Sequence, residues 1–101
     1  MSSAYIIKVT GDTTLDPGYD TYLVEPVSNT VLTLPSITGD GIKFTVSRID
    51  SDTTKTVTFQ GQTGENINDY SSISIDIHEN ITVASYTSPS NKWYTICGIW
   101  N

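Results

Sequence analysis

The chain consists of short runs of β-forming residues separated by turn residues at intervals of about eight to twelve positions. In the clearest run, Ile42, Phe44 and Val46 alternate with polar residues. Successive side chains of a strand point to opposite faces of a sheet, so this pattern predicts a strand with one buried face and one solvated face. No segment has the apolar spacing of an amphipathic helix. The sequence therefore predicts an all-β fold.

We expect residues 1–101 to form a single domain, because this length is close to the commonest domain size. The residues from Met1 to Ser3 are interpreted as an artificial start of the chain. The spacing of the runs favours a small antiparallel β-sandwich of about seven to nine strands. Its predicted core is the set of apolar residues at alternating positions: Ile42, Phe44, Val46, Val57, Phe59, Ile73, Ile75, Ile81, Val83, Trp93 and Ile96.

Charge and hydropathy exclude two classes of partner. The net charge is −6, and the five basic residues are scattered along the chain. A nucleic-acid-binding protein normally gathers basic residues into a patch that neutralises phosphates, so no nucleic acid is expected as a partner. No apolar run approaches the length of about 20 residues that spans a bilayer, so we expect no membrane insertion.

The residues that carry metal or covalent chemistry are few. Structural zinc needs four Cys or His ligands, whereas the chain has one of each, Cys97 and His78. We expect Cys97 to be a buried apolar residue of the last strand. The segment Asp50-Ser51-Asp52 has the carboxylate spacing that opens a calcium loop, but it lacks the glycine and the final glutamate. A simple turn is therefore favoured there, with a metal site as the alternative.

No cofactor and no enzymatic activity are expected. The acidic residues lie in predicted turns or on solvated faces, where no apolar surroundings would raise their pKa values. A binding or structural module is favoured.

Two polar connections are the candidate ligand-binding segments. Loops vary without disturbing the core, and their tyrosines, amides and carboxylates suit contact with sugars. The alternative is that these polar residues close turns by bonding to the backbone. The segments are 61–70 and 16–22, and the candidate residues are Tyr19, Asp20, Tyr22, Asn66, Asp69 and Tyr70.

An ordered set of short motifs gives a resemblance to a known family. The run Val31-Leu32-Thr33-Leu34-Pro35 is followed by Gly41-Ile42-Lys43-Phe44-Thr45-Val46, with Arg48 and Asp50 after it. Later come the strand Lys55 to Phe59, a loop with two glycines, an alternating strand, and Ser90-Asn91-Lys92-Trp93-Tyr94. This order resembles the small β domain at the C-terminal tips of phage and giant-virus fibres.

The resemblance implies a trimeric fibre head, displayed at the virion surface or at the tip of an extracellular fibre, that attaches to a host-surface receptor such as a glycan. Ile99 and Trp100 are candidate contacts of the homotrimer, because an apolar tail is expected to be covered by neighbouring subunits. A passive domain that trimerises or caps a fibre shaft without any ligand is the alternative function.

Overall fold

The structure of the chain is a computed structural model that describes residues 5–99. It contains nine strands, within the predicted range. β-branched and aromatic residues fill them, as expected for pleated, half-buried positions. The strands are β1 (Ile6–Val9), β2 (Thr13–Thr14), β3 (Thr21–Val24), β4 (Thr30–Thr33), β5 (Lys43–Arg48), β6 (Val57–Gln60), β7 (Ser72–Ser74), β8 (Asn80–Tyr86) and β9 (Lys92–Ile99).

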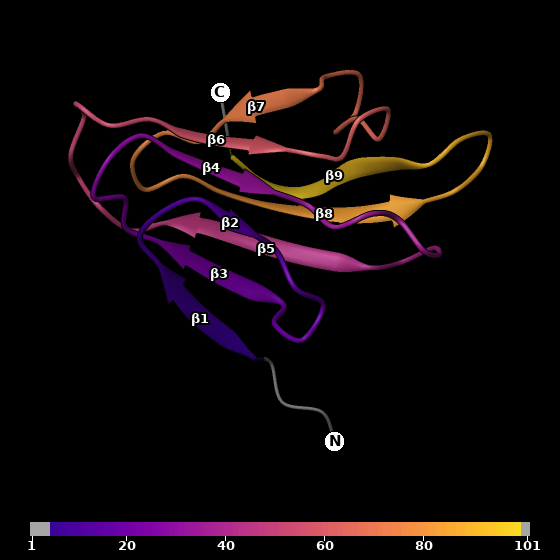
Figure 1. Cartoon of the computed structure of the whole chain (residues 1–101), viewed down its shortest axis with the longest axis horizontal. Coiled ribbons are helices and arrows are strands. Elements are labelled where there is room, and N and C mark those ends of the chain that lie inside the picture. The colour runs from indigo at the N-terminus through magenta and orange to yellow at the C-terminus, as the bar shows by residue number, and fades with distance from the viewer. Residues whose placement is uncertain (1–4, 100–101) are drawn as a thin grey trace.

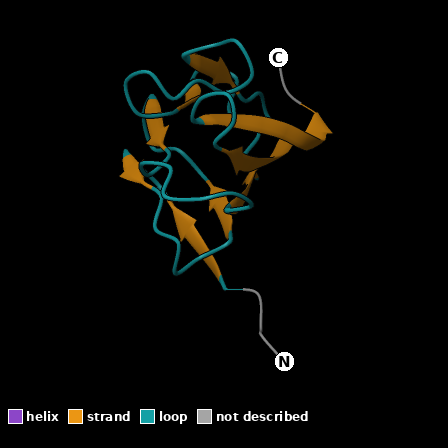
Figure 2. Ribbon diagram, turned by 90° about the vertical axis from the view of Figure 1, so that its right-hand side faces the viewer, coloured by secondary structure: helices purple, strands orange, loops and turns teal. Residues whose placement is uncertain are grey.

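The strands form two sheets that enclose one core (Figures 1 and 2). The larger sheet has the order β1-β3-β5-β8-β9, and the smaller has the order β2-β4-β6-β7. The prediction of an all-β, two-sheet fold is confirmed. No helix occurs in residues 5–99, so this part of the chain has no helix long and apolar enough to cross a membrane.

The prediction of an antiparallel sandwich is wrong, because the first six strands pair in parallel. β1 pairs with β3 and β3 with β5 in the larger sheet, while β2 pairs with β4 and β4 with β6 in the smaller one. The chain therefore alternates between the two sheets, so that each pair of successive strands forms one turn of a coil. Consecutive strands face each other across the core instead of pairing as a hairpin. Each strand pairs with the strand two positions later in the chain, which runs in the same direction.

The last three strands end this coil in antiparallel pairs. β7 pairs with β6 in the smaller sheet, while β8 pairs with β5 and β9 pairs with β8 in the larger sheet. β8 and β9 form the C-terminal hairpin. In Figure 1, β1 lies at one end of the stack of strands and β7 lies at the other.

Most of the predicted core residues are buried, but two differ from the prediction. Ile42 is only half-buried, although it packs against the core. Ile96 is 52% exposed, because a bulge in β9 shifts the pairing between Thr95 and Cys97 and turns Ile96 outward. Cys97 then pairs with Thr82 on the solvated face and is exposed, so the prediction of a buried Cys97 is also wrong.

Other residues of the parallel strands and of the connections between strands complete the core. A row of aromatic rings crosses it from β3 to β9: Tyr22 lies 6.2 Å from Phe44, and Phe44 lies 5.8 Å from Trp93, centroid to centroid. The buried apolar residues that the sequence prediction did not include are Leu15, Tyr22, Val24, Leu32, Leu34, Ile37 and Ile67.

Candidate functional site

The loop between β6 and β7 is held firmly against β9. Ile67 is fully buried, and its backbone N–H donates to the carbonyl oxygen of Tyr70 while the N–H of Tyr70 donates back. Asn68 has a φ of 52° and donates its backbone N–H to the carbonyl oxygen of Trp93 at 2.7 Å. The amide side chain of Asn68 donates to the Thr95 hydroxyl and accepts from the Thr95 N–H. These bonds fix the turn at residues 67–70 relative to the core.

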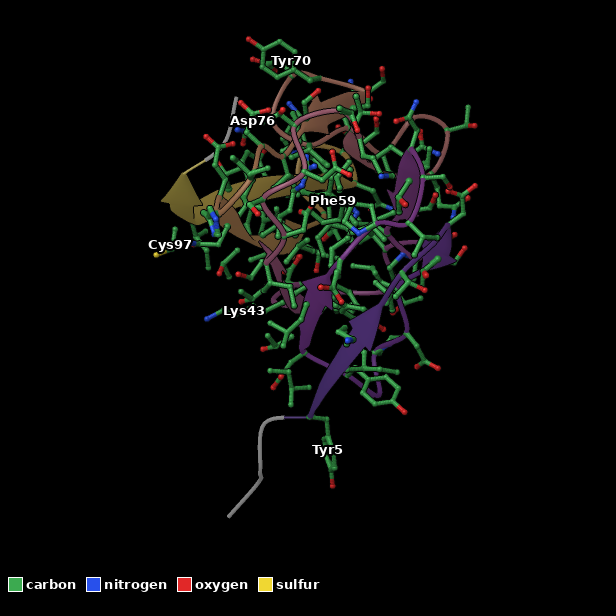
Figure 3. All side chains as sticks on the ribbon, turned by 90° about the vertical axis from the view of Figure 1, so that its left-hand side faces the viewer. Tyr5, Lys43, Phe59, Tyr70, Asp76 and Cys97 are labelled. Atoms are coloured by element: carbon green, nitrogen blue, oxygen red, sulfur yellow. The ribbon has the colours of Figure 1, made fainter. Side chains whose placement is uncertain are left out.

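The fixed turn presents two of the predicted ligand residues to solvent. Tyr70 is 61% exposed, and Figure 3 shows its ring pointing away from the body of the molecule. The side chain of Asp69 is also exposed, and its Oδ1 lies 3.4 Å from the Nζ of Lys92. Asn66 is half-buried, and its backbone carbonyl oxygen accepts the N–H of Trp93, which ties the loop to β9.

The outer face of the β8–β9 hairpin continues this surface. Lys92 lies opposite Tyr86 in the pairing of β8 with β9. The Nζ of Lys92 lies 5.8 Å from the centroid of the Tyr94 ring. Tyr86 is 49% exposed and Tyr94 is half-buried. We call Asp69, Tyr70, Tyr86, Lys92 and Tyr94 the tip surface.

The hairpin residues of the tip surface were not among the predicted ligand residues. A signal for them exists in the sequence: alternation along the final hairpin puts Tyr86, Lys92 and Tyr94 on the face opposite Trp93. What the sequence does not show is that the loop at residue 69 reaches the same face.

The second predicted ligand segment has a structural role at one position. Tyr22 is 2% exposed and its ring packs in the core. Its hydroxyl accepts the N–H of Asp16 at 2.7 Å and donates to the carbonyl oxygen of the same residue at 3.1 Å. Burial of the hydroxyl raises the pKa of Tyr22 above its ordinary value. Tyr22 therefore closes the connection before β3 and presents no surface to a ligand, which corrects its place among the candidates.

Removal of this hydroxyl should be measurable. Tyr22→Phe is expected to lower the free energy of unfolding by about 1–2 kcal/mol, because the Asp16 backbone groups lose their partner. The matched control is Tyr19→Phe, since Tyr19 is 37% exposed and its ring lies edge-on to that of Tyr22. Urea unfolding of both variants tests this, and equal stabilities of the two would contradict the role assigned to the Tyr22 hydroxyl.

The two predicted ligand segments do not form a single site. Tyr19 and Asp20 are exposed just before β3, whereas the loop with Tyr70 is bound to β9. β5 and β8 lie between β3 and β9 in the larger sheet, and three strand spacings amount to about 14 Å. The tip surface is therefore the better candidate, because both of its segments are in contact.

The segment Asp50-Ser51-Asp52 is occupied by contacts within the protein. Arg48 is 3% exposed, and its Nε donates to Oδ1 of Asp50 at 2.7 Å. This hydrogen bond holds the pKa of Asp50 below its usual range. Asp52 accepts the N–H and the hydroxyl of Thr54 and pairs with Lys55, which lowers the pKa of Asp52 as well. Both carboxylates thus serve the turn.

No cluster of three or more metal-ligating side chains occurs within residues 5–99. A shallow hollow lies beside Arg48. The Arg48 guanidinium donates to the Asp50 carboxylate and to three backbone carbonyl oxygens, those of Ile75, Asp52 and Lys55. Most of its N–H groups are therefore bonded within the protein and not free for a ligand. Arg48 is a structural residue that the sequence prediction did not identify.

Of the two predicted trimer contacts, Ile99 is the last residue of β9. The backbone of Ile99 pairs with that of Asn80, and Trp100 lies outside the described residues.

A scan against protein-family models and a search of curated proteins both find no match to this chain.

Proposed function

We propose that this chain is the head domain of a trimeric fibre and that it attaches to a host-surface receptor, with a glycan as the receptor class. The observation that carries the proposal is the rigid presentation of Asp69 and Tyr70 on a loop bound to β9. A head domain needs such a surface at the end away from its shaft. Figure 3 shows Tyr5, which precedes β1, and Tyr70 at opposite ends of the molecule.

The chemistry of the tip surface suits a sugar. A tyrosine ring offers an apolar face to a pyranose and a hydroxyl to its polar edge. The carboxylate of Asp69 and the ammonium group of Lys92 are exposed enough to exchange their long 3.4 Å contact for sugar hydroxyls. The surface is shallow, so each copy is expected to bind weakly, and attachment would gain strength from three copies acting together.

The homotrimer is part of the same proposal, and the order of motifs in the sequence supports it. In this proposal the domain is displayed at the virion surface or at the tip of an extracellular fibre. Light scattering of the purified chain at low concentration should give three times the chain mass, and a monomer mass across the concentration range would count against the trimer.

A glycan array tests the binding function. The parent chain should bind at least one class of glycan. Tyr70→Ala and Tyr94→Ala should each weaken that binding by about tenfold, as expected for the loss of about 1–2 kcal/mol at a contact. Tyr5→Ala is the matched control, since Tyr5 is 62% exposed and Tyr70 is 61% exposed.

Two results would overturn this assignment. If the Tyr70 and Tyr94 variants bind as well as the Tyr5 variant, the ligand does not use the tip surface. If the parent chain binds neither glycans nor host cells, a passive capping domain becomes the better function. The antiparallel strands β7 to β9, which close the parallel coil, favour that second candidate.

A further inference from the structure

The two sheets have four edge strands, and these differ in how far they are covered. β2 and β7 are only two and three residues long. The start of β9 is covered by the loop, because the N–H of Trp93 donates to Asn66 and the carbonyl oxygen of Trp93 accepts from Asn68. A bulge also interrupts β9. Within residues 5–99, β1 is the edge that is open along its whole length.

The backbone of β1 has hydrogen-bonding groups that point away from the sheet. The carbonyl oxygen of Tyr5 accepts the N–H of Thr21, and that of Val9 accepts the N–H of Glu25, so these two groups face β3. Peptide groups alternate in direction along a strand. The N–H and C=O groups of Ile6 and Lys8 therefore face outward, and they form a template for another strand.

The side chains at this edge are apolar. Tyr5 and Ile6 are 62% and 58% exposed. Ile7 and Val9 pack against the core from one side and are only half-buried, so the core reaches the surface between the two sheets at this end. Natural edge strands are usually protected by charges, prolines or bulges. Of these, β1 carries only Lys8.

We propose that the β1 edge pairs with the β1 edge of a second copy of this chain, antiparallel and about a two-fold axis through Ile7. In this register Ile6 of one copy lies opposite Lys8 of the other, and the outward N–H and C=O groups of both residues are paired. Ile7 meets Ile7 of the second copy on the core side. The two larger sheets then form one continuous sheet.

The local charges at the β1 edge are compatible with a second copy as the partner. Lys8 is paired with Glu25 of its own chain at 3.2 Å, and it faces an uncharged Ile6 across the contact, so no like charges are directly opposed. The neighbouring edge of the smaller sheet is the two-residue β2, which is too short to extend the pairing, so the contact is confined to the larger sheet. A four-residue edge buries far less than the roughly 800 Å² per partner of a stable interface, so the pairing is concentration-dependent.

The pairing goes beyond the proposed function and is independent of it. If three copies also associate elsewhere, with the two-fold axes perpendicular to the three-fold axis, the pairing gives a closed assembly of six, and its loss returns three. In either case, blocking β1 halves the mass at high concentration. The glycan array tests the binding proposal separately, and a negative result there would not change the mass expected in this experiment.

Sedimentation velocity of Ile6→Lys and Ile96→Lys over a dilution series tests the pairing. The two isoleucines lie in opposite edge strands of the same sheet and are 58% and 52% exposed. Ile6→Lys should halve the high-concentration mass of the parent, whereas Ile96→Lys should keep it. Hydrogen exchange of the parent should show concentration-dependent protection of the Ile6 and Lys8 amides.

Three results would overturn the proposal. The first is an equal mass for the parent and Ile6→Lys at every concentration. The second is loss of association in Ile96→Lys, which would place the contact at β9. The third is exchange of the Ile6 and Lys8 amides that does not depend on concentration. Circular dichroism spectra that match the parent establish that both variants fold.

Discussion

Arg48→Ala is expected to lower the free energy of unfolding by about 3–5 kcal/mol, the usual cost of removing one partner from a buried ion pair. Arg48 is the last residue of β5, and its side chain points toward the core. Its guanidinium links the turn after β5 to the segment between β7 and β8, where it donates to the carbonyl oxygen of Ile75. Its removal takes the guanidinium donor from the Asp50 carboxylate and from the carbonyl oxygens of Asp52 and Lys55. The expected fall in melting temperature is about 15–30 °C.

The matched control is Lys8→Ala. The Lys8–Glu25 pair has a similar N–O distance, 3.2 Å, but both side chains are about half exposed. Such pairs contribute about 0–1 kcal/mol. Arg48→Lys should fall between the two, because an ammonium group keeps the charge but cannot reproduce the forked geometry. Equal melting temperatures for Arg48→Ala and Lys8→Ala would contradict the structural role of Arg48.

The same ion pair predicts the response of the parent to acid. The pKa of Asp50 is lower in the folded protein than in the unfolded chain, where an aspartate has a pKa of about 3.9. Its contribution to stability is therefore complete above that pH and is lost as the pH falls toward the folded-state pKa. Urea unfolding as a function of pH should show this loss below about pH 4 in the parent and much less of it in Arg48→Ala.

Gly61→Ala is expected to lower the free energy of unfolding by about 3 kcal/mol, in the upper range for single substitutions. A Cβ at Gly61 would overlap the carbonyl oxygen of Glu65. That backbone cannot easily move, because the N–H of Glu65 donates to Gln62 and its carboxylate accepts the N–H of Ile37. The substitution should displace the loop that carries Tyr70 and so weaken glycan binding as well.

Gly39→Ala is the control for Gly61→Ala. No atom lies within 4 Å of a Cβ built at Gly39, so its stability should change by no more than about 0.5 kcal/mol. Thermal unfolding followed by circular dichroism compares the two. A Gly61→Ala protein as stable as Gly39→Ala would show that the loop is not held as the structure describes.

The sequence was sufficient to predict the apolar inward-facing residues of β5, β6 and β8, but not which strands are neighbours. The two-residue period of Phe44 and Val46, or of Val57 and Phe59, assigns each side chain to a face of its sheet. It carries no information on whether the next strand along the chain pairs beside it or lies across the core. That choice depends on packing between the sheets, and it gives the parallel coil where hairpins were expected.

The errors at individual residues have local physical causes. The bulge that exposes Ile96 and Cys97 lies directly before Gly98, which has a φ of 117°. A glycine inside a strand pattern often marks a bulge, and the prediction did not use this signal. Tyr22 follows the alternation of β3 into the core, but its neighbours in a polar, tyrosine-containing segment suggested a surface role. Arg48 continues the inward series of Phe44 and Val46, and its burial is possible only because Asp50 pairs with it.

The candidate site was predicted in part for a related reason. Loop composition identified Asp69 and Tyr70, since exposed polar loops are found where function varies. Contact of the loop with Lys92 depends on the bonds that Asn68 makes to β9. These bonds join residues far apart in the chain, so no local sequence pattern predicts them.

The central claim is that a glycan receptor binds the tip surface, and residue-level NMR titration of the labelled parent with a glycan selected on the array tests it most directly. The account predicts saturable chemical-shift changes at Asp69, Tyr70, Lys92 and Tyr94, with little change at Tyr5 at the opposite end of the molecule. Changes confined to other residues, or no saturable change with any glycan, would contradict it.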